Sequence, residues 1–462
     1  MRTEKDSLGT KDLPDDALYS IHTQRSLENF GIGEEPFPLP IVHAMARLKQ
    51  ACARANAASG DMDEEKARAI EEAAKEVSSG RWDRSFRIDT YQAGSGTSSH
   101  MNVNEVIANL AAEKLGGRRG EKKLVHPNDD VNRGQSSNNI VPSAIRMAAY
   151  ESSFNLLEQL QSLILEFRKK GAAFKGIIKA ARTHLQDAVP ITLGQEFDAY
   201  ARMLEKDLGR VEEARKRLLE LGVGGNAVGT GLNTKEGFRQ RIIEELKALT
   251  KLPYQIAVDG VEMTQSLTDL AAFSAMLKML ALDLQKVCND LRLLSSGPHA
   301  GFHEIILPPV EPGSSIMPGK VNPSICESVI MACMQVQGLD HAIVLAAGAG
   351  QLELNTHMPL VGRNILKTIG LLTKASQSLG KKCITGIKAD EERCRKHLET
   401  SAGLATILNP LLGYDKVAEL VKQEQEQGKT LRELVLENGI MDEQQFEELI
   451  RKATGPGLRN PD

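Results

Sequence analysis

The sequence predicts an all-α fold, with a three-domain subunit built around a central bundle of long helices. Apolar residues recur at spacings of three and four over several long segments, which is the pattern of amphipathic helices. Strand-like alternation is scarce along the chain. The length of 462 residues is too great for one compact core, so the helices are expected to belong to more than one domain.

The first region, residues 1–137, is expected to form an N-terminal, mostly helical domain. Helical stretches are indicated over residues 39–58 and 63–78, and turns rich in Gly, Pro and Asn separate them from their surroundings. These pieces are shorter than the ones that follow. This change in helix length and turn composition gives the first domain boundary.

Residues 138–390 carry the patterns of long helices and are expected to form a central helical bundle domain. No proline occurs between Ser143 and Val189, and the apolar stripe in this segment consists of Phe154, Leu157, Leu160, Ile164 and Phe167. A second stripe ends before the glycine run at 222–231 and consists of Phe197, Tyr200, Leu204, Leu208, Val211, Ala214, Leu218 and Leu221. A third segment, between Gly260 and Gly297, lacks Gly and Pro and is apolar on more than one face, which indicates a buried helix.

Two further candidates, residues 324–349 and 361–379, bring the central region to roughly five long helices, which is the content of a helical bundle. Helices of this length bury apolar faces most easily against each other and against copies of themselves, so we expect a homo-oligomer. Residues 391–462 change to short, charged helices such as TLRELVLENG (430–439). A small C-terminal helical domain is therefore expected.

Composition and charge exclude several classes of partner. The net charge of -4 gives no electrostatic reason to expect nucleic acid as a partner. The sequence holds no run of about 18 apolar residues, and its N-terminus is charged from the second residue. We therefore expect neither a membrane span nor a signal peptide, and we expect a cytoplasmic protein.

The six cysteines are scattered along the chain without a CxxC pair; they are Cys52, Cys288, Cys326, Cys333, Cys383 and Cys394. This spacing argues against a disulfide framework and against a zinc cage. Buried, reduced thiols are expected.

Four stretches rich in Ser, Thr, Asn and His depart from the helical pattern. They are GSGTSSHMNVNE (94–105), HPNDDVNRGQSSNN (126–139), ARTHLQD (181–187) and GSSIMPGKVNPS (313–324). Each one alone has a structural explanation, because Ser, Thr, Asn and Asp cap helices and form turns. Four together indicate a functional site.

Phosphate, metal and cofactor sites are not indicated. The runs GSGT and GVGGNAVGTG lack the GK[ST] ending of a phosphate loop, and no strand is expected before either of them. The second run is expected to be a turn between helices. HPND has no HExxH motif, Cys/His cluster or spaced carboxylate set beside it, so we expect neither a metal ion nor a cofactor.

His184 has two interpretations. A single His near the start of a helix is usually a hydrogen-bonded structural residue. Alternatively, Glu327 is its catalytic partner, because a carboxylate bonded to one imidazole nitrogen fixes the tautomer and raises the basicity of the other. The sequence leaves both interpretations open.

With these stretches in view, the chain resembles the aspartase/fumarase superfamily, and within it the class II fumarases and the aspartate ammonia-lyases. GSSIMPGKVNP is close to that family's signature loop. The resemblance extends over nearly the whole chain, through EKDSLG, HTQRSLENF, GSGTSS, VHPNDDVN, QSSN, RTHLQDAVPITLGQEF, GTGLNT, NDLRLLSSGP and NPLLGYDK. It implies a mostly helical subunit of three domains that assembles into a homotetramer, a small dicarboxylate substrate, and active sites that are each built from three subunits.

Carried over residue by residue, the resemblance implies that Ser314 is the catalytic base and that His184 and Glu327 serve the other half of the reaction. The substrate ligands that it implies are Ser95, Gly96, Thr97, Ser136, Ser137, Asn138, Thr183, Ser315, Lys320 and Asn322. His126, Pro127, Asn128 and Asp129 match a segment that forms a secondary carboxylate site in fumarases.

These residue types suit proton removal beside a carboxylate. The product of that step is a doubly charged aci-carboxylate, which needs many hydrogen-bond donors and a cation such as Lys320. A serine hydroxyl is a poor base in water, so the alkoxide of Ser314 needs backbone N–H donors from its loop. Gly313 and Gly319 permit the close backbone approach that this requires.

Within the family, the residues at the substrate favour hydration of fumarate to L-malate. Ser95 of GSGT, the second serine of QSSN and His126 are typical of fumarases, whereas CNDLRLLSSGP, GQLELN and DTYQAG are typical of aspartate ammonia-lyases. Four positions fit neither pattern; they are His100, Asn139, His299 and His357. The alternatives are an aspartate ammonia-lyase, a lyase acting on another succinate derivative, and a structural protein of the crystallin type, against which the intact loop residues argue.

Overall fold

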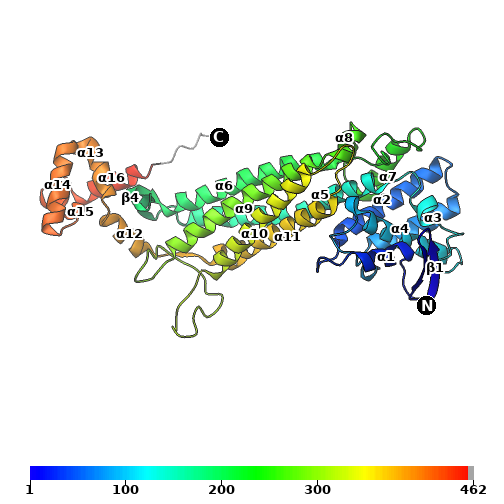
Figure 1. Ribbon diagram of the computed structural model, residues 1–462. Coiled ribbons are helices and arrows are strands. Elements are labelled where there is room, and N and C mark those ends of the chain that lie inside the picture. The colour runs from blue at the N-terminus through cyan, green and yellow to red at the C-terminus, as the bar shows by residue number, and fades with distance from the viewer. Residues whose placement is uncertain (456–462) are drawn as a thin grey trace. The chain divides into compact units, whose positions relative to one another are not determined.

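The computed structural model describes residues 1–455, and most of them are helical (Figure 1). The chain forms two compact units, and each of them combines three segments of the sequence. The first unit comprises Met1–Leu157, Gly209–Met279 and Gln335–Leu372. The second unit comprises Glu158–Leu208, Leu280–Met334 and the chain from Thr373 onward.

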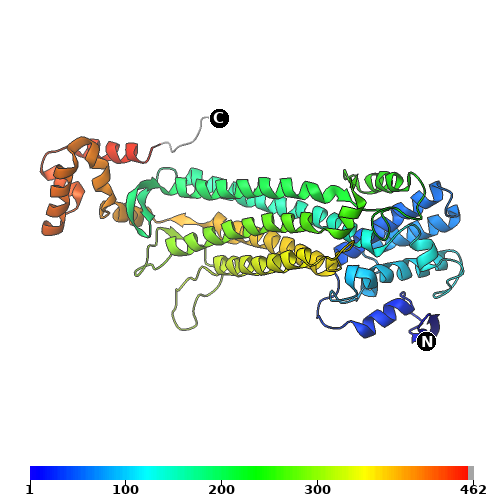
Figure 2. The same ribbon diagram turned by 45° about the horizontal axis from the view of Figure 1, so that its top comes forward.

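The long helices expected from the apolar stripes are present. The described residues contain five helices of more than 20 residues, which are α5 (Ser137–Ala173), α6 (Leu193–Arg215), α9 (Thr268–Leu294), α10 (Ser324–Gly348) and α11 (Met358–Lys382). Within each unit the segments of these helices lie side by side (Figures 1 and 2). The mostly helical fold class is therefore confirmed.

The apolar stripes of α5 and α6 pack against each other in the second unit. The rings of Phe167 and Phe197 lie 6.1 Å apart between centroids, and the Tyr200 hydroxyl donates to Asp290 Oδ2 at 2.9 Å. Phe154 departs from the expected buried stripe, since it is 43% exposed. The guanidinium of Arg215 lies 4.3 Å from the centroid of its ring, and this contact replaces burial in the core.

Helix α10 has the length and hydropathy of a membrane span, and 44% of its most apolar window is buried. It also carries Asp340, which is 1% exposed and accepts hydrogen bonds from Ser274 at 2.8 Å and Lys278 at 2.5 Å. The exposed side of this helix includes the polar residues Gln335 and His341 and four large apolar residues, Met331, Met334, Val344 and Leu345, which are between 49% and 65% exposed. These four residues are referred to below as the α10 apolar face.

Strands are short and occur in pairs within the described residues. Antiparallel pairs are formed by β1 (Arg2–Asp6) with β2 (Gly9–Leu13), β3 (Ile178–Thr183) with β4 (Gln186–Thr192), and β7 (Ile305–Ile306) with β8 (Lys388–Ala389). The pair β5 (Glu220–Leu221) and β6 (Gln255–Ile256) is parallel. The expected helix start at His184 is therefore wrong, because this residue lies in the turn between β3 and β4.

Residues 1–136 form short helices, as their sequence indicates. They are α1 (Ile21–Asn29), α2 (Leu39–Ala58), α3 (Glu64–Ser78) and α4 (Thr97–Lys114). The two helices expected at 39–58 and 63–78 are confirmed, and Asp63 caps the second by accepting from the N–H of Lys66. Single-turn elements are η1 (Asp83–Ser85), η2 (Gly94–Gly96), η4 (Lys216–Leu219), η5 (Ile384–Gly386) and the π-helical η3 (Pro127–Val131).

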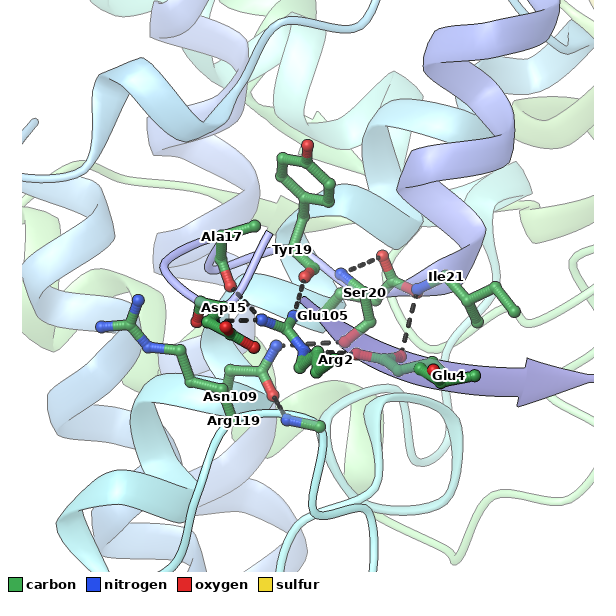
Figure 3. A network of polar contacts seen from close by, with 12 residues as sticks. Arg2, Glu4, Asp15, Ala17, Tyr19, Ser20, Ile21, Glu105, Asn109 and Arg119 are labelled. Atoms are coloured by element: carbon green, nitrogen blue, oxygen red, sulfur yellow. Dashed lines mark hydrogen bonds and ion pairs between the residues drawn. The ribbon is translucent and has the colours of Figure 1, made fainter. Parts of the chain in front are cut away.

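The start of α1 is capped by a residue from a different helix, Glu105 of α4 (Figure 3). Its carboxylate accepts from the backbone N–H groups of Ser20, His22 and Thr23 at 3.0, 2.9 and 3.0 Å. Burial raises the pKa of Glu105, and these donors act against that shift. Glu105 therefore satisfies three N–H groups at this helix start, and Glu4 accepts from that of Ile21 at 3.2 Å.

The glycine run at 222–231 is a turn before α7 (Phe238–Thr250), as expected, and α8 (Gly260–Gln265) crosses it closely. A Cβ atom on Gly229 would lie 2.0 Å from the carbonyl oxygen of Gly260. Gly229 is thus required because two backbones touch there.

The C-terminal helices have a hydrophobic core of their own. They are α12 (Glu391–Glu399), α13 (Gly403–Leu412), α14 (Tyr414–Gln427), α15 (Leu431–Glu437) and α16 (Glu443–Ala453). Ala180 of β3 belongs to this core, so the β3–β4 hairpin packs on the C-terminal helices. The domain division at 137 and 390 remains a prediction; Ser137 is the first residue of α5, and Asp390 is the N-cap of α12.

All six cysteines are buried and free, so the expected reduced thiols are confirmed. Three of them gather in the second unit, where the sulfur atoms of Cys326 and Cys383 lie 3.8 Å apart. Cys288 is hydrogen-bonded to Cys326.

Replacing Glu105 by Ala is expected to lower the free energy of unfolding by about 2–3 kcal/mol, because three buried N–H groups lose a charged acceptor. Urea denaturation followed by circular dichroism measures this change. Glu113→Ala on the same helix removes an exposed carboxylate and is expected to change stability by less than about 0.5 kcal/mol. Equal effects of the two substitutions would contradict the capping role.

Candidate active site

The GSGT stretch forms a tight turn at the start of α4. Ser95 adopts a left-handed backbone conformation with φ of 60° and is 5% exposed. Its hydroxyl lies 3.2 Å from that of Thr97, the first residue of α4. A Cβ atom on Gly96 would lie 2.9 Å from a methyl of Val141, so this turn packs directly on the first turns of α5.

The QSSN stretch occupies the start of α5. The Ser136 hydroxyl accepts from the N–H of Asn138 at 3.2 Å, and the Asn138 amide donates to the carbonyl of Ala227 at 2.8 Å. The Ser137 hydroxyl lies 2.9 Å from His100 Nδ1. The structure therefore brings GSGT and QSSN together at two helix N-termini, where free N–H groups and the helix dipole favour an anion.

HPND forms the π-helical turn η3, also in the first unit. His126 Nδ1 accepts from the N–H groups of Asn128 and Asp129 at 3.2 and 3.1 Å, which leaves Nε2 carrying the proton. The N–H of His126 donates to Asp130 at 2.7 Å. Asn128 and Asp129 are exposed, and Pro127 is buried.

Thr183 and His184 lie at the tip of the β3–β4 hairpin in the second unit. His184 and Leu185 have φ of 55° and 60°, which is the conformation of a two-residue hairpin turn. Apart from Gly, the residues Asn, Asp and His adopt it several-fold more often than the rest, so the unusual residue of this turn is Leu185. The turn thus places His184 at the tip of the hairpin.

A buried group of charges holds the base of this hairpin. Glu304 is fully buried and accepts two hydrogen bonds from Arg182 at 2.8 and 3.0 Å, one from Lys179 at 2.9 Å and one from His397 at 2.9 Å. The Arg182 guanidinium also lies 4.1 Å from the centroid of the Phe302 ring. Because Arg182 precedes Thr183, these contacts fix the direction in which the hairpin tip points.

The 313–324 loop positions the Ser314 hydroxyl against its own backbone. Ser314 Oγ accepts from the N–H groups of Ile316 and Met317 at 3.2 and 3.1 Å. The loop is closed by a hydrogen bond of 3.0 Å from the N–H of Gly313 to the carbonyl of Lys320. A Cβ atom on Gly313 would lie 2.2 Å from that carbonyl oxygen, so glycine is required there.

The remaining loop residues lie around Ser314. Ser314 and Lys320 line the same hollow, whose wall runs from Pro309 to Val321. The Asn322 amide donates to the Gly313 carbonyl at 2.6 Å, and Ser315 is exposed. The structure thus brings the proposed base and the lysine to one pocket formed by the loop itself.

Glu327, in the first turn of α10, has Arg292 as its ionic partner, at 3.8 Å. Within residues 1–455 no hydrogen bond joins it to His184. The catalytic pairing of these two residues stays a prediction, as do the roles of all the residues assigned from the resemblance. The same part of the chain contains no group of three His, Cys, Asp or Glu side chains arranged to hold a metal ion.

Comparison with known proteins identifies the family. A lyase family model matches residues 9–338, and a model of the fumarase C C-terminus matches residues 404–454. The chain belongs to the fumarase/aspartase family of lyases. Its similarity to individual members does not separate the two activities.

The fumarate hydratase class II of Thermosynechococcus vestitus is 45% identical to the chain, and the match covers 97% of each sequence. The aspartate ammonia-lyase of Pseudomonas aeruginosa is 47% identical, over 96% of this chain and 94% of that protein. The fold is similar to that of the fumarate lyase:delta crystallin of Brucella melitensis, with a TM-score of 0.96, 43% identity, and coverage of 98% of this chain and 100% of that one.

Sequence reasoning missed three charged residues that support the site, Lys49, Arg182 and Glu304. Lys49 lies among apolar positions of the helix expected at 39–58, and a single charge on a buried helix face was the available signal. Arg182 lies inside the ARTHLQD stretch. Glu304 lies outside every polar stretch, so its part in holding the hairpin becomes visible only in the structure.

Replacing Glu304 by Ala is expected to lower the free energy of unfolding by about 3–5 kcal/mol, because it leaves Arg182 without its carboxylate and leaves the buried Lys179 with Glu196 alone. Urea denaturation measures the loss. Glu392→Ala on α12 removes an exposed carboxylate and is expected to change stability by less than about 0.5 kcal/mol. A loss below about 1 kcal/mol for Glu304→Ala would show that the group is dispensable.

The same group predicts a pH dependence. Burial raises the pKa of Glu304, but the hydrogen bond from Arg182 and the charge of Lys179 outweigh it and lower the pKa below 4.5. The ionised carboxylate therefore stabilises the fold above pH 4.5, and this contribution is lost as the pH falls through the lowered pKa. The stability difference between the natural chain and Glu304→Gln is expected to shrink below that pH; a constant difference down to about pH 3 would contradict it.

Proposed function

We propose that the protein is a fumarate hydratase of class II, which reversibly adds water to fumarate to give L-malate through an aci-carboxylate intermediate. The observation that carries this proposal is the loop geometry. Ser314 Oγ receives two backbone N–H donors and shares a hollow with Lys320. These contacts would stabilise an alkoxide, which a serine needs in order to act as a base near neutral pH.

In the direction from malate, the Ser314 alkoxide takes the proton from the CH₂ carbon beside a carboxylate. The electron pair of that C–H bond moves into the carboxylate and forms the aci-carboxylate. Lys320 and Asn322, with the hydroxyls of Ser315 and Thr97, are proposed to bind the charge that develops. Donors that bind the intermediate more strongly than the ground state lower the barrier.

The second step breaks the C–O bond at the neighbouring carbon. The electron pair of the intermediate re-forms the double bond, and hydroxide leaves as water after it receives a proton. His184 is proposed to supply this proton through a water molecule, with Glu327 as its carboxylate partner. The turn supports this role because it presents His184 at the tip of the hairpin, held there by the unusual positive φ of Leu185.

The choice of hydroxide over ammonia as the leaving group rests on the residues at the substrate. Ser95 adds a buried hydroxyl beside Thr97, where the resemblance gives alanine to aspartate ammonia-lyases. The second candidate function is aspartate ammonia-lyase activity. It is favoured by the 47% identity to the Pseudomonas aeruginosa enzyme and by the CNDLRLLSSGP stretch.

The α10 apolar face supports a homotetramer. Four large apolar side chains lie exposed along one helix, and their burial against copies of the same helix would remove them from water. In the proposed assembly three subunits contribute to each active site. This arrangement would join the first-unit residues of GSGT and QSSN to the second-unit loop of another copy.

The His126–Asp129 turn is proposed as a secondary carboxylate site. Because His126 Nδ1 accepts two N–H groups, its Nε2–H is a donor available to a carboxylate. The exposure of Asn128 adds a second donor at the surface.

Purified protein is expected to produce fumarate from L-malate, with little or none from L-aspartate, because the site offers hydroxyl donors and a proton source for a departing hydroxide. Ultraviolet absorbance of fumarate measures both reactions in separate assays. Fumarate formed from aspartate but not from malate would replace the proposed activity with the second candidate.

Ser314→Ala is expected to lower kcat by about 10²–10⁴-fold, because it removes the base while leaving the carboxylate ligands in place. Steady-state kinetics and size-exclusion chromatography together test this, since the oligomer is expected to be unchanged. Ser79→Ala, at the exposed end of α3, serves as the matched control. An active Ser314→Ala protein would refute the assignment of the base.

A further inference from the structure

A buried lysine and a buried histidine lie behind the QSSN stretch, and the mechanism above uses neither of them. Lys49 of α2 is fully buried, and His100 of α4 is 1% exposed. Lys49 Nζ lies 2.7 Å from His100 Nε2, 3.0 Å from Asn132 Oδ1 and 2.8 Å from Gln135 Oε1. His100 Nδ1 lies 2.9 Å from the Ser137 hydroxyl.

The orientation of both amides is fixed by their other contacts. The Gln135 amide nitrogen donates to the carbonyls of Val131 and Arg133 at 3.0 and 3.2 Å, so its oxygen must face Lys49. The Asn132 amide nitrogen donates to the Gln135 carbonyl at 3.2 Å, so its oxygen faces Lys49 as well. Two of the three N–H bonds of a charged Lys49 are therefore committed to oxygen.

The third N–H of Lys49 points at His100 Nε2, which must then be an unprotonated acceptor. The imidazole proton is on Nδ1 and is donated to Ser137 Oγ. Burial and the charge of Lys49 lower the pKa of His100 well below its ordinary value, which keeps the ring neutral. Ser137 Oγ thus accepts from His100 and keeps its own proton for another acceptor.

We propose that Lys49 and His100 are positioning residues that aim the Ser137 hydroxyl proton at the substrate carboxylate. This inference rests on the proposed function and deepens it, because it explains why the hydroxyl of Ser137, a proposed substrate ligand, donates toward the substrate. Ser137 is the first residue of α5, so the aimed proton and the free N–H groups of the helix start face the same anion.

The arrangement has a second state. If Lys49 loses one proton, its two remaining N–H bonds stay on the amide oxygens and its lone pair faces His100. The ring then carries its proton on Nε2 and donates it to Lys49, while Nδ1 accepts from the Ser137 hydroxyl. In total the group has lost one proton, which left from Nδ1 on the side of Ser137. In this state the Ser137 hydroxyl donates to Nδ1 and no longer to the substrate.

The two states exchange near neutral pH. Burial lowers the pKa of Lys49 to about 7, so the donor state of Ser137 is present below that pH and is lost above it. The other titratable groups facing this pair are Cys52 on α2 and His22 on α1. Burial raises the pKa of Cys52 to about 12 and lowers that of His22, so both stay neutral across the exchange.

Calorimetric binding of fumarate to the assembled protein between pH 6 and 9 tests the inference without requiring turnover. The dissociation constant of the natural chain is expected to rise about fivefold to tenfold through pH 7, since one hydrogen bond to a charged group is lost. His100→Asn keeps a donor at the Nδ1 position but cannot change tautomer. Its dissociation constant for fumarate at pH 6 is therefore expected to stay within about threefold of that of the natural chain, and to change little between pH 6 and 9.

His100→Gln places its amide at the Nε2 position, reaches Lys49 and leaves Ser137 without a donor. It is expected to bind fumarate about fivefold to tenfold more weakly at pH 6, and to add no further loss in a Ser137→Ala background. His43→Gln, also on α2, is the matched control and is expected to keep the profile of the natural chain.

The outcomes separate this inference from the proposed function. Fumarate binding with the same pH dependence in the natural chain, His100→Asn and Ser137→Ala overturns the positioning role alone. Additive losses from His100→Gln and Ser137→Ala overturn it as well, because they would reflect packing. No fumarate binding at any pH in the natural chain overturns the proposed function together with this inference.

Discussion

The proposed function depends on one constraint. Hydrogen-bond donors must be aimed at the place where a substrate carboxylate would gain charge, while their own acceptor atoms are satisfied elsewhere. Ser314 Oγ and Ser136 Oγ each accept a bond from inside the protein, and Ser137 Oγ is proposed to accept one from His100. A hydroxyl that already accepts one bond donates its proton in a defined direction, or holds negative charge if the proton is lost. Preorganised donors of this kind need no rearrangement when the reaction occurs.

Long helices and a buried charge group supply the rigidity that this aiming requires. The starts of α4 and α5 meet through the contact of Gly96 with Val141, which fixes two helix N-termini against each other. In the second unit Glu304 fixes Arg182, and through it the strained tip that carries Thr183 and His184. A buried ion group contributes less to net stability than its contacts suggest, so its retention here fits a positioning role.

Local sequence patterns predicted the helices, whose positions depend on the spacing of nearby apolar residues. The apolar spacing located α2 and α10 to within a residue or two, because a stripe of buried side chains requires a helix at those positions. The β3–β4 turn was missed, since His–Leu is not a usual hairpin-turn pair and Leu185 adopts a positive φ that leucine rarely takes. Lys49 and Glu304 were missed because their partners are distant in sequence. The polar stretches were found because four of them together exceed the needs of caps and turns.

The central claim is that GSGT and QSSN of one copy and the 313–324 loop of another form one active site. Mixing Ser137→Ala and Ser314→Ala proteins, unfolding them together and refolding them tests this most directly. Random assembly of equal amounts would give about a quarter of the sites both native serines. Measured well below the KM for malate, where Ser137→Ala alone is expected to keep only about a tenth to a fifth of the activity, the refolded mixture is expected to reach slightly more than about a quarter of the activity of the natural chain. Activity that stays at the level of the two separate variants would contradict a site shared between copies.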